Sequence, residues 1–391
     1  MSDTTGLQLS QSVHPGGMAD LVTCGIDSQL IVKVIHPMGI VGLDIGGANI
    51  KAADEQGHTN SRPFAIWRHP ERLSEQVQAI LQNYPGCDQI ALTMTAELAD
   101  CFVTKAEGVR SILRSVEECL PDLEQSAVQS AVAPEKLMVW TTRGHFVDAS
   151  TARTQTEFVA AANWHALATW CGKLCPQGSS VLVDIGTTTT DIIPLQDGKP
   201  VSIGLTDVSR LQSGELSYSG IRRTPVCALA HSVPFRDGYC SLAAEMFATT
   251  LDLYLLLGDL TEDPSDVETA NCKAATKAEA YHRLARMLCG DRNEISLSEA
   301  VEMARFLADV QRQRLSGSLE RVVSRLTSPC QTVMVSGSGE FLARRLVADN
   351  RKTNAARVIS LEEQFSEGVA EAACAYAVAQ LAAMRKRYCK V

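Results

Sequence analysis

The feature that most constrains the fold is a strand and turn that occur twice. Gly39–Asp44 is a short apolar run that ends in a carboxylate, and Ile45-Gly46-Gly47 then turns the chain. At an offset of 140 residues, Ser180–Asp184 is again an apolar run that ends in a carboxylate, and Ile185-Gly186 follows it. A repeat with so long a period predicts a duplicated lobe and not a short solenoid unit. The expectation is an α/β chain with two similar halves.

The 391 residues divide into three parts on this basis. Residues 1–38 are irregular and are interpreted as an N-terminal extension, expected to be flexible. The first lobe is predicted over 39–177 and the second over 178–391, with a helical insertion at about 240–315. Long helices are predicted over 154–174 and 367–387, where apolar residues recur at helical spacing.

Composition narrows the class of protein. A net charge of −9 and a pI of about 5.5 argue against a nucleic-acid partner, which needs a basic face. No apolar run is long enough for a transmembrane helix and no signal peptide is visible, so no membrane partner and a cytoplasmic location are expected. Thirteen scattered cysteines are predicted to be free thiols. The oligomeric state stays open, with a homodimer as one option.

Three glycine turns suit a phosphate group. Glycines let main-chain N–H groups approach an anion closely, and threonine hydroxyls donate to phosphate oxygens. A turn that leads from a strand into a helix also presents a helix N-terminus. Each turn alone fits an ordinary hairpin, whereas the three together predict a cleft for a phosphorylated small molecule. The predicted contacts are Gly46, Gly47, Asn49, Lys51, Gly186, Thr187, Thr188, Thr189, Ser336, Gly337 and Gly339.

Four carboxylates are candidates for chemistry. Asp44 and Asp184 end their strands and are predicted to coordinate Mg²⁺ or to orient water, with turn capping as the alternative. Glu97 follows a predicted strand over 89–95 and is the candidate general base, with helix capping as the alternative. Asp252 interrupts an apolar stretch and needs a partner there, so it is a predicted metal ligand, with a polar stripe of an amphipathic helix or a salt bridge with an arginine as the alternative.

Arg222 and Arg223 are adjacent and follow a Tyr-Ser-Gly turn. Neighbouring guanidinium groups in a loop can bind a diphosphate or a carboxylate in bidentate fashion. The alternative is a charge pair that faces solvent. Both arginines are predicted contacts of the diphosphate.

The three glycine turns resemble the two phosphate motifs and the adenosine motif of the superfamily that contains actin, the heat-shock ATPases and the sugar and acetate kinases. This resemblance implies a two-lobed, duplicated actin-like (ribonuclease H-like) fold with a helical insertion in the second lobe. From residue 39 onward, several segments also resemble the hydantoinase/oxoprolinase-related proteins linked to tetrahydromethanopterin one-carbon metabolism. These segments are Leu43–Ala53, Thr93–Leu98, Val183–Asp191, Ser219–Pro225, Phe247–Asp252 and Val335–Glu340.

The second resemblance implies an activity. Archaeal relatives of that family form an ether in methanofuran biosynthesis, joining an aminomethylfuran-methyl diphosphate to a phenol and releasing diphosphate. A similar transferase step is implied here, with Mg²⁺ and an acceptor derived from tyramine or tyrosine, in formaldehyde oxidation through a methylofuran cofactor. ATP can bind on this interpretation but is not required. An ATP-dependent kinase, a hydantoinase/oxoprolinase-type hydrolase and a noncatalytic nucleotide-binding regulator stay open as alternatives, because a fold does not determine a function.

Overall fold

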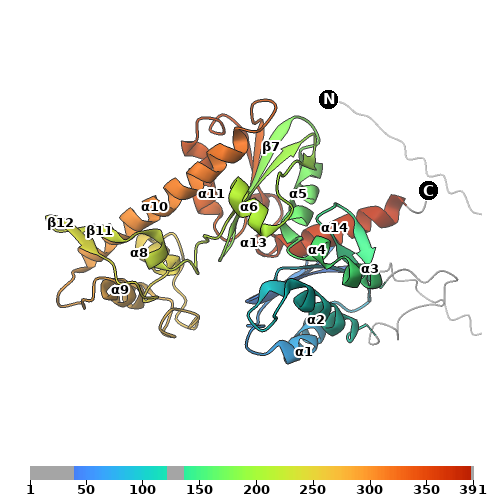
Figure 1. Ribbon diagram of the computed structural model, residues 1–391, viewed down its shortest axis with the longest axis horizontal. Helices are drawn as coiled ribbons and strands as arrows, with labels where there is room; N and C mark the ends of the chain where they lie inside the picture. Colours follow the sequence, from blue (N-terminus) through green and yellow to red (C-terminus); the bar gives the residue numbers. More distant parts are fainter. Residues whose placement is uncertain (1–38, 121–135, 389–391) are drawn as a thin grey trace, which may run out of the picture. The chain divides into compact units, whose positions relative to one another are not determined.

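The computed structural model describes residues 39–120 and 136–388 (Figure 1). The expectation of a flexible extension over 1–38 therefore lies outside the described residues. Within the described ranges no helix is long and apolar enough to cross a membrane. The eleven cysteines that these ranges contain are free thiols.

The first sheet has six strands in the order β3-β2-β1-β4-β5-β6. β1 pairs antiparallel with β2 and parallel with β4, and β4 pairs parallel with β5. Helices α1 and α2 contribute to one core with the apolar residues of β1 and β4. The strands are β1 (Gly39–Ile45), β2 (Asn49–Asp54), β3 (Thr59–Pro63), β4 (Cys87–Met94), β5 (Leu137–Trp140) and β6 (Phe146–Asp148). The helices are η1 (Pro70–Arg72), α1 (Leu73–Leu81), η2 (Ala96–Leu98), α2 (Lys105–Glu117), α3 (Ala149–Thr154) and α4 (Thr156–Val159).

The second sheet repeats the arrangement of the first, in the order β10-β8-β7-β13-β14 with β9 beside β8. β7 pairs antiparallel with β8 and parallel with β13, and β13 pairs parallel with β14. The prediction of a duplicated, two-lobed α/β fold is confirmed. The strands are β7 (Ser179–Ile185), β8 (Thr190–Gln196), β9 (Lys199–Pro200), β10 (Leu216–Ser217), β13 (Thr332–Ser336) and β14 (Arg357–Ser360). The helices that accompany them are α6 (Asp207–Ser213), α7 (Val226–Leu229), α11 (Glu340–Asp349) and α12 (Leu361–Gln364).

The insertion in the second lobe has its own core, built mainly from α8 (Thr250–Leu257), α9 (Lys277–Arg286) and α10 (Leu297–Val323) (Figure 1). The prediction of helix throughout 240–315 was only partly right. A hairpin of β11 (Ser232–Phe235) and β12 (Gly238–Ser241) overlaps its start, and the chain between α8 and α9 is irregular.

Two predicted long helices are interrupted. The segment 154–174 contains α4 and α5 (Asn163–Leu174), and between them Ala161 has a φ of 47°, which no right-handed helix accepts. The segment 367–387 contains α13 (Glu367–Glu371) and α14 (Ala373–Tyr388), which are separated at Ala372. Alanine favours a helix at both breaks, so the interruption is imposed by tertiary packing.

Helices α5 and α14 pack on each other and connect the two sheets. α14 also packs on β1, β2 and β4 of the first sheet, although it follows the second lobe in sequence. Gly42 of β1 permits this contact, because a Cβ there would overlap the main-chain carbonyl of Ala375. One apolar core accordingly contains Ile40 from the first sheet and Leu182 from the second. The two sheets therefore share one core.

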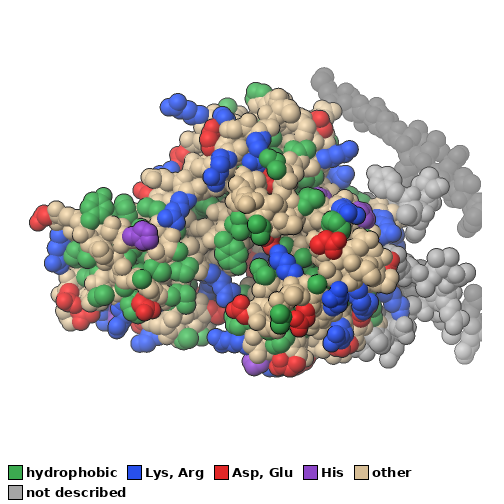
Figure 2. Space-filling view, viewed as in Figure 1, with side chains coloured by type: hydrophobic (Ala, Val, Ile, Leu, Met, Phe, Trp, Pro, Cys, Tyr) green, Lys and Arg blue, Asp and Glu red, His purple; other side chains and the backbone are tan. Residues whose placement is uncertain are grey.

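A second connection joins α2 to α6. The Nζ atom of Lys105 lies 2.7 Å from Oδ2 of Asp207. Apolar side chains lie near α6 among polar and charged ones (Figure 2), and the chain at α6 exposes Ile203 and Val208 at 67% each. The two lobes thus meet at a polar contact with exposed apolar side chains beside it.

Candidate active site

The turns after β1 and β7 have the same main-chain structure. Gly46 N donates to Asn49 O and Gly186 N donates to Thr189 O, both at 2.9 Å. Among the described residues, no acceptor is found for the main-chain N–H groups of Gly47 and Thr188. N–H groups of this kind are available to an anion. Both turns therefore keep the property that predicted phosphate binding.

Asp44 is the last residue but one of β1, its carboxylate is buried, and Oδ1 has no hydrogen-bond partner. Burial raises the pKa of Asp44 to about 6, against the opposing effect of the Lys51 ammonium. Lys51 lies directly across the hairpin, and its Nζ donates to Glu371 O at 2.6 Å. This predicted phosphate contact is therefore already tied to the end of α13, from where its charge acts on Asp44.

Asp184 occupies the corresponding place, as the last residue but one of β7. Burial raises the pKa of Asp184 to about 7, and the negative charges of Asp191 and Asp44 contribute in the same direction. Burial also raises the pKa of the Cys374 thiol, with further contributions from Asp44 and Asp184. The charge of Asp44 acts on Asp184, both charges act on Cys374, and Gly42 of β1 contacts the main chain of Ala375, so the two strand ends and the first turn of α14 lie in one neighbourhood. The structure thus brings the two predicted carboxylates together.

The third glycine turn lies over the second. Ser336 is the register partner of Asp184, and its buried hydroxyl opposes the rise in the pKa of that carboxyl group. Gly337 has a φ of 87°, and a Cβ at this position would contact Asp184 Oδ1 and overlap the Ile185 carbonyl. Gly339 N donates to the same carbonyl at 2.8 Å. Ser336, Gly337 and Gly339 therefore belong to the surroundings of Asp184.

The loop of Arg222 and Arg223 lies against the second turn, because the main-chain N atoms of both donate to Thr187 O at 3.0 Å. Their side chains differ. Arg222 forms an ion pair with Asp266. The Arg223 guanidinium lies over the ring of Trp67, with Cζ 5.3 Å from the ring centroid, and has no ion pair in the described parts of the chain. In the described parts of the chain, Arg222 is engaged through one terminal nitrogen, whereas no nitrogen of the Arg223 guanidinium has a hydrogen-bond or ion-pair partner.

Glu97 lies in η2, just after β4, and is only 1% exposed. Neither carboxylate oxygen has a hydrogen-bond partner, and the nearest cation, Lys105 Nζ, is 3.9 Å from Oε1. Burial raises the pKa of Glu97 to about 7. The main chain just before Glu97 is bonded to the start of the first turn, because Thr95 N donates to Ile45 O at 2.9 Å. A buried carboxyl group that titrates near neutral pH has the properties of a general base.

Asp252 has the arginine partner that the sequence left open as an alternative. Arg283 Nε donates to Oδ1 at 2.7 Å, and Thr249 N donates to Oδ2 at 2.9 Å in the capping box of α8. Burial still raises the pKa of Asp252 to about 6, although Arg283 opposes this. Both oxygens are engaged, so Asp252 is assigned to the core of the insertion and not to a metal site.

The carboxylates of Asp44 and Asp184 suit Mg²⁺ better than a metal ion whose ligands are all protein side chains. In the described ranges, no three side chains of the types His, Cys, Asp and Glu are grouped to hold a metal ion. Mg²⁺ is usually held by one or two carboxylates, with water and substrate phosphate completing its octahedron. Asp44, with its unpartnered Oδ1, and the neighbouring Asp184 fit that donor set.

The sequence interpretation missed a buried ion pair behind the second turn. Arg210 is 2% exposed, forms an ion pair with Asp191, and has its Cζ 4.1 Å from the ring centroid of Trp164. Asp191 stands at the repeat position of Lys51, so aligning the two hairpins could have identified it. No sequence pattern links it to Arg210.

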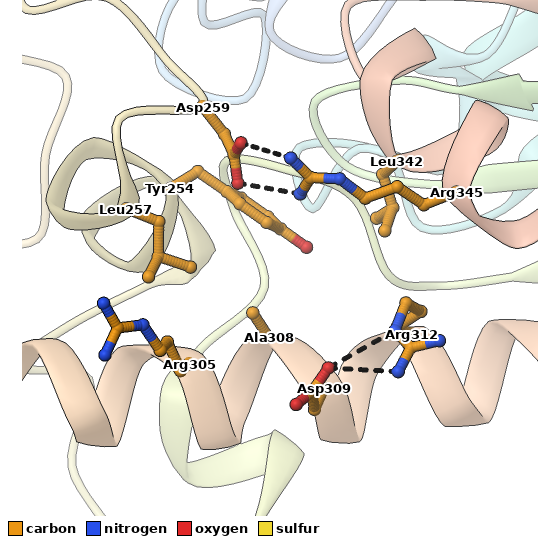
Figure 3. A pocket seen from close by; sticks show the side chains of 9 residues that line it. All are labelled: Tyr254, Leu257, Asp259, Arg305, Ala308, Asp309, Arg312, Leu342 and Arg345. Atoms are coloured by element: carbon orange, nitrogen blue, oxygen red, sulfur yellow. Dashed lines mark hydrogen bonds and ion pairs between the residues drawn. The ribbon is translucent and has the colours of Figure 1, made fainter.

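A separate hollow of about 330 Å³ lies between α8, α10 and α11 (Figure 3). In Figure 3 Asp259 faces Arg345, whose two terminal nitrogens lie 2.9 and 2.5 Å from the carboxylate oxygens. Tyr254 lines the hollow and connects it to the site, because its hydroxyl donates to Gln311 Oε1 at 2.6 Å. Gln311 Nε2 in turn donates to Gly220 O at 2.9 Å, in the loop that contacts the second turn.

Comparison with known proteins identifies the family. The model of the hydantoinase/oxoprolinase family matches residues 88–385. The chain is 32% identical over 346 residues to the (4-{4-[2-(gamma-L-glutamylamino)ethyl]phenoxymethyl}furan-2-yl)methanamine synthase of Methanocaldococcus jannaschii, covering 88% of this chain and 97% of that protein. A protein of the same name from Methanococcus vannielii is 32% identical over 201 residues, which are 51% of this chain and 89% of that protein.

A more distant likeness is to a nucleotide-free structure of acetone carboxylase, with a TM-score of 0.49 and 10% identity. It covers 87% of this chain and 69% of that chain. At this similarity it has no bearing on the site. The family match extends over most of the chain and includes the second and third turns. The chain belongs to the hydantoinase/oxoprolinase family.

Proposed function

We propose that this chain is a transferase of the methanofuran and methylofuran type of cofactor biosynthesis, serving tetrahydromethanopterin-linked one-carbon metabolism. It joins an aminomethylfuran-methyl diphosphate to a phenolic acceptor derived from tyramine or tyrosine. The bond from the furfuryl carbon to the diphosphate oxygen breaks, and the diphosphate leaves with the electron pair. The phenol oxygen forms the new ether bond to that carbon after losing its proton.

Two observations together support this proposal most strongly. One is a similar synthase whose name describes an ether product, and the other is the pair of glycine turns with open N–H groups. That relative is similar over 97% of its own length. The N–H groups of Gly47 and Thr188 are open to an anion, and Asp44 and Asp184 each stand just before one of these turns. Donors preorganised around a leaving anion lower the barrier to its departure.

The carboxylates have separate roles in this proposal. Asp44 and Asp184 would hold Mg²⁺, which neutralises charge on the departing diphosphate when it is bound. Glu97 accepts the phenolic proton, because its pKa of about 7 leaves a substantial fraction ionised at neutral pH. Of the two adjacent arginines, Arg222 forms an ion pair and Arg223 does not, so Arg223 donates to the diphosphate.

The test is a reaction of the purified full chain with furfuryl diphosphate, tyramine and Mg²⁺. We expect diphosphate release that depends on tyramine, together with an ether product of the corresponding mass. Omission of tyramine serves as the control for simple hydrolysis. Diphosphate release that is independent of every phenol offered would contradict the proposal.

One observation favours the ATP-dependent alternative. The hollow between α8, α10 and α11 is lined by Leu342 and Arg345, on the helix that follows the third turn. By the resemblance, that turn corresponds to an adenosine motif. Calorimetric titration with ATP–Mg²⁺, followed by a turnover assay, distinguishes the two functions. ATP hydrolysis without phenol-dependent diphosphate release would favour a kinase or hydrolase.

A further inference from the structure

Trp67 is held beside the first turn. Ile66 N donates to Gly47 O at 3.2 Å, and Phe64 N donates to Ala48 O at 2.8 Å, so the chain leaving β3 follows the turn closely. Trp67 is the next residue and is half-buried. The three other tryptophans, Trp140, Trp164 and Trp170, belong to the core between the sheets and are at most 4% exposed. Trp67 is therefore the one tryptophan of the four that can meet a ligand.

Arg223 reaches this indole from the second lobe. Its main chain is bound to Thr187 O of the second turn, and its guanidinium lies over the Trp67 ring at 5.3 Å from the centroid. The guanidinium has no hydrogen bond or ion pair in the described parts of the chain, so this ring contact is its sole interaction there. A guanidinium has five N–H donors, which a cation–π contact leaves free for an anion.

Resting on the proposed function, we propose that Trp67 is the stacking surface for the aromatic ring of the diphosphate substrate. A ring attached to diphosphate through one methylene group must lie next to the anion. An anion between the two turns places its ring beside whichever side chain borders them, and Trp67 borders the first. Arg223 then exchanges the indole face for the diphosphate, and the flat ring takes the position that the guanidinium leaves.

This arrangement makes a specificity prediction. An aromatic diphosphate gains ring stacking on Trp67, whereas an aliphatic diphosphate of equal charge gains only the contacts of the anion. We expect furfuryl diphosphate to bind roughly tenfold more tightly than butyl diphosphate, and Trp67→Ala to abolish that preference. Trp67→Phe retains a ring and is expected to keep part of it.

The binding test uses the full chain with Mg²⁺ and two readouts. Calorimetry gives the affinity for furfuryl diphosphate, butyl diphosphate and inorganic diphosphate. Tryptophan emission should change most with furfuryl diphosphate, and this change should be absent in Trp67→Phe. Tyr239→Ala removes another exposed aromatic ring, 71% exposed on β12, and serves as the matched control with wild-type preference.

Two outcomes would overturn the inference. One is a preference for the aromatic diphosphate that persists in Trp67→Ala. The other is an emission change with furfuryl diphosphate that persists in Trp67→Phe, which would place the bound ring away from Trp67. Trp67→Leu keeps more of the side-chain volume than Trp67→Ala but lacks the ring. It replaces Trp67→Ala in the binding assay if Trp67→Ala does not fold.

Failure of the proposed function is distinguishable from failure of this inference. If no phenol supports diphosphate release, the proposed reaction is wrong, while the binding preference is still measured directly. If release occurs and Trp67→Ala leaves KM for furfuryl diphosphate unchanged, the reaction stands and the role of Trp67 is wrong. In the expected result, KM rises roughly tenfold and kcat changes little, because stacking contributes equally to bound substrate and transition state.

Discussion

The two Asp-Ile-Gly hairpins have the same backbone and opposite electrostatics. Asp44 lies opposite Lys51 across its hairpin, whereas Asp184 lies opposite Asp191 in the same register. The lysine opposes the rise in the pKa of Asp44, and Asp191 adds to the rise in that of Asp184. The second hairpin then needs Arg210 to compensate Asp191. Duplication supplied one scaffold, and the side chains opposite the carboxylates made the two copies different.

The lobes also differ after the parallel strand that follows each hairpin. In the first lobe β4 continues into η2, where Glu97 is buried without hydrogen-bond partners. In the second lobe β13 continues into the turn of Gly337 and Gly339, which closes over Asp184. The first lobe thus carries a group that can accept a proton, and the second carries main-chain groups that can enclose an anion. Substitutions in each lobe should therefore have different effects.

The largest effect is expected from Glu97→Gln. This change keeps the volume and removes the base, so phenol-dependent diphosphate release should fall by roughly 10²- to 10⁴-fold in kcat. Glu340→Gln is the matched control from the second lobe, since Glu340 is 5% exposed and paired with Arg344. A fall of less than about tenfold in Glu97→Gln, or an equal fall in the control, would remove Glu97 from the reaction.

Arg210→Met should have the next largest effect, on stability. It leaves Asp191 as an uncompensated buried charge, which costs about 3–5 kcal/mol in the free energy of unfolding. Urea denaturation measures this cost. Lys51→Met is the comparison in the first hairpin, where no buried ion pair is broken, and it should cost less than about 1 kcal/mol. Equal costs in the two variants would contradict the electrostatic difference between the hairpins.

The local parts of this fold and site were predictable from sequence, and the non-local parts were not. An apolar run, a carboxylate and a glycine turn lie within about ten residues, so both hairpins and the duplication could be recognised. The partner of Asp252 is Arg283, on the next helix, and Arg210 reaches Asp191 from beyond β9. Such pairings depend on how helices pack against other elements. The spacing of residues along one helix does not predict that packing.

Secondary structure shows the same limit. The break at Ala161 and the break at Ala372 occur in alanine-rich segments whose helical periodicity continues across them. In both cases the chain turns where helices must pack between two sheets. Sequence could predict that these segments are helical, while the position of each interruption depends on the assembled core.

Asp184→Asn and Asp44→Asn should stabilise the metal-free protein above neutral pH. A raised carboxyl pKa means that the native state binds more protons than the unfolded state, so wild-type stability falls as pH rises from about 4 through the native pKa. The asparagine variants lack this loss. At pH 8 the gain has an upper bound of about 4 kcal/mol for Asp184→Asn and about 3 kcal/mol for Asp44→Asn, from pKa values of about 7 and about 6.

The measurement is thermal or urea unfolding with EDTA present, at pH 4 and pH 8. Below pH 4 each variant should match the wild type, because the native carboxyl group is then protonated. With Mg²⁺ added, the order should reverse at pH 8, since the ion stabilises only a protein with both carboxylates. A gain in stability that does not depend on pH would show that burial does not perturb these groups.

The smallest effect is expected from Lys51→Met, and it isolates the charge opposite Asp44. Without the ammonium the pKa of Asp44 should rise above about 6, because burial is no longer opposed. Mg²⁺ binding requires the ionised carboxylate, so the midpoint of its pH dependence should move upward and affinity at pH 7 should fall several-fold. Calorimetric Mg²⁺ titrations from pH 5 to pH 8 measure this shift. Lys51→Arg keeps the charge and should keep the midpoint; a midpoint unchanged in both variants would mean that the hairpins do not differ through their cross-strand partners.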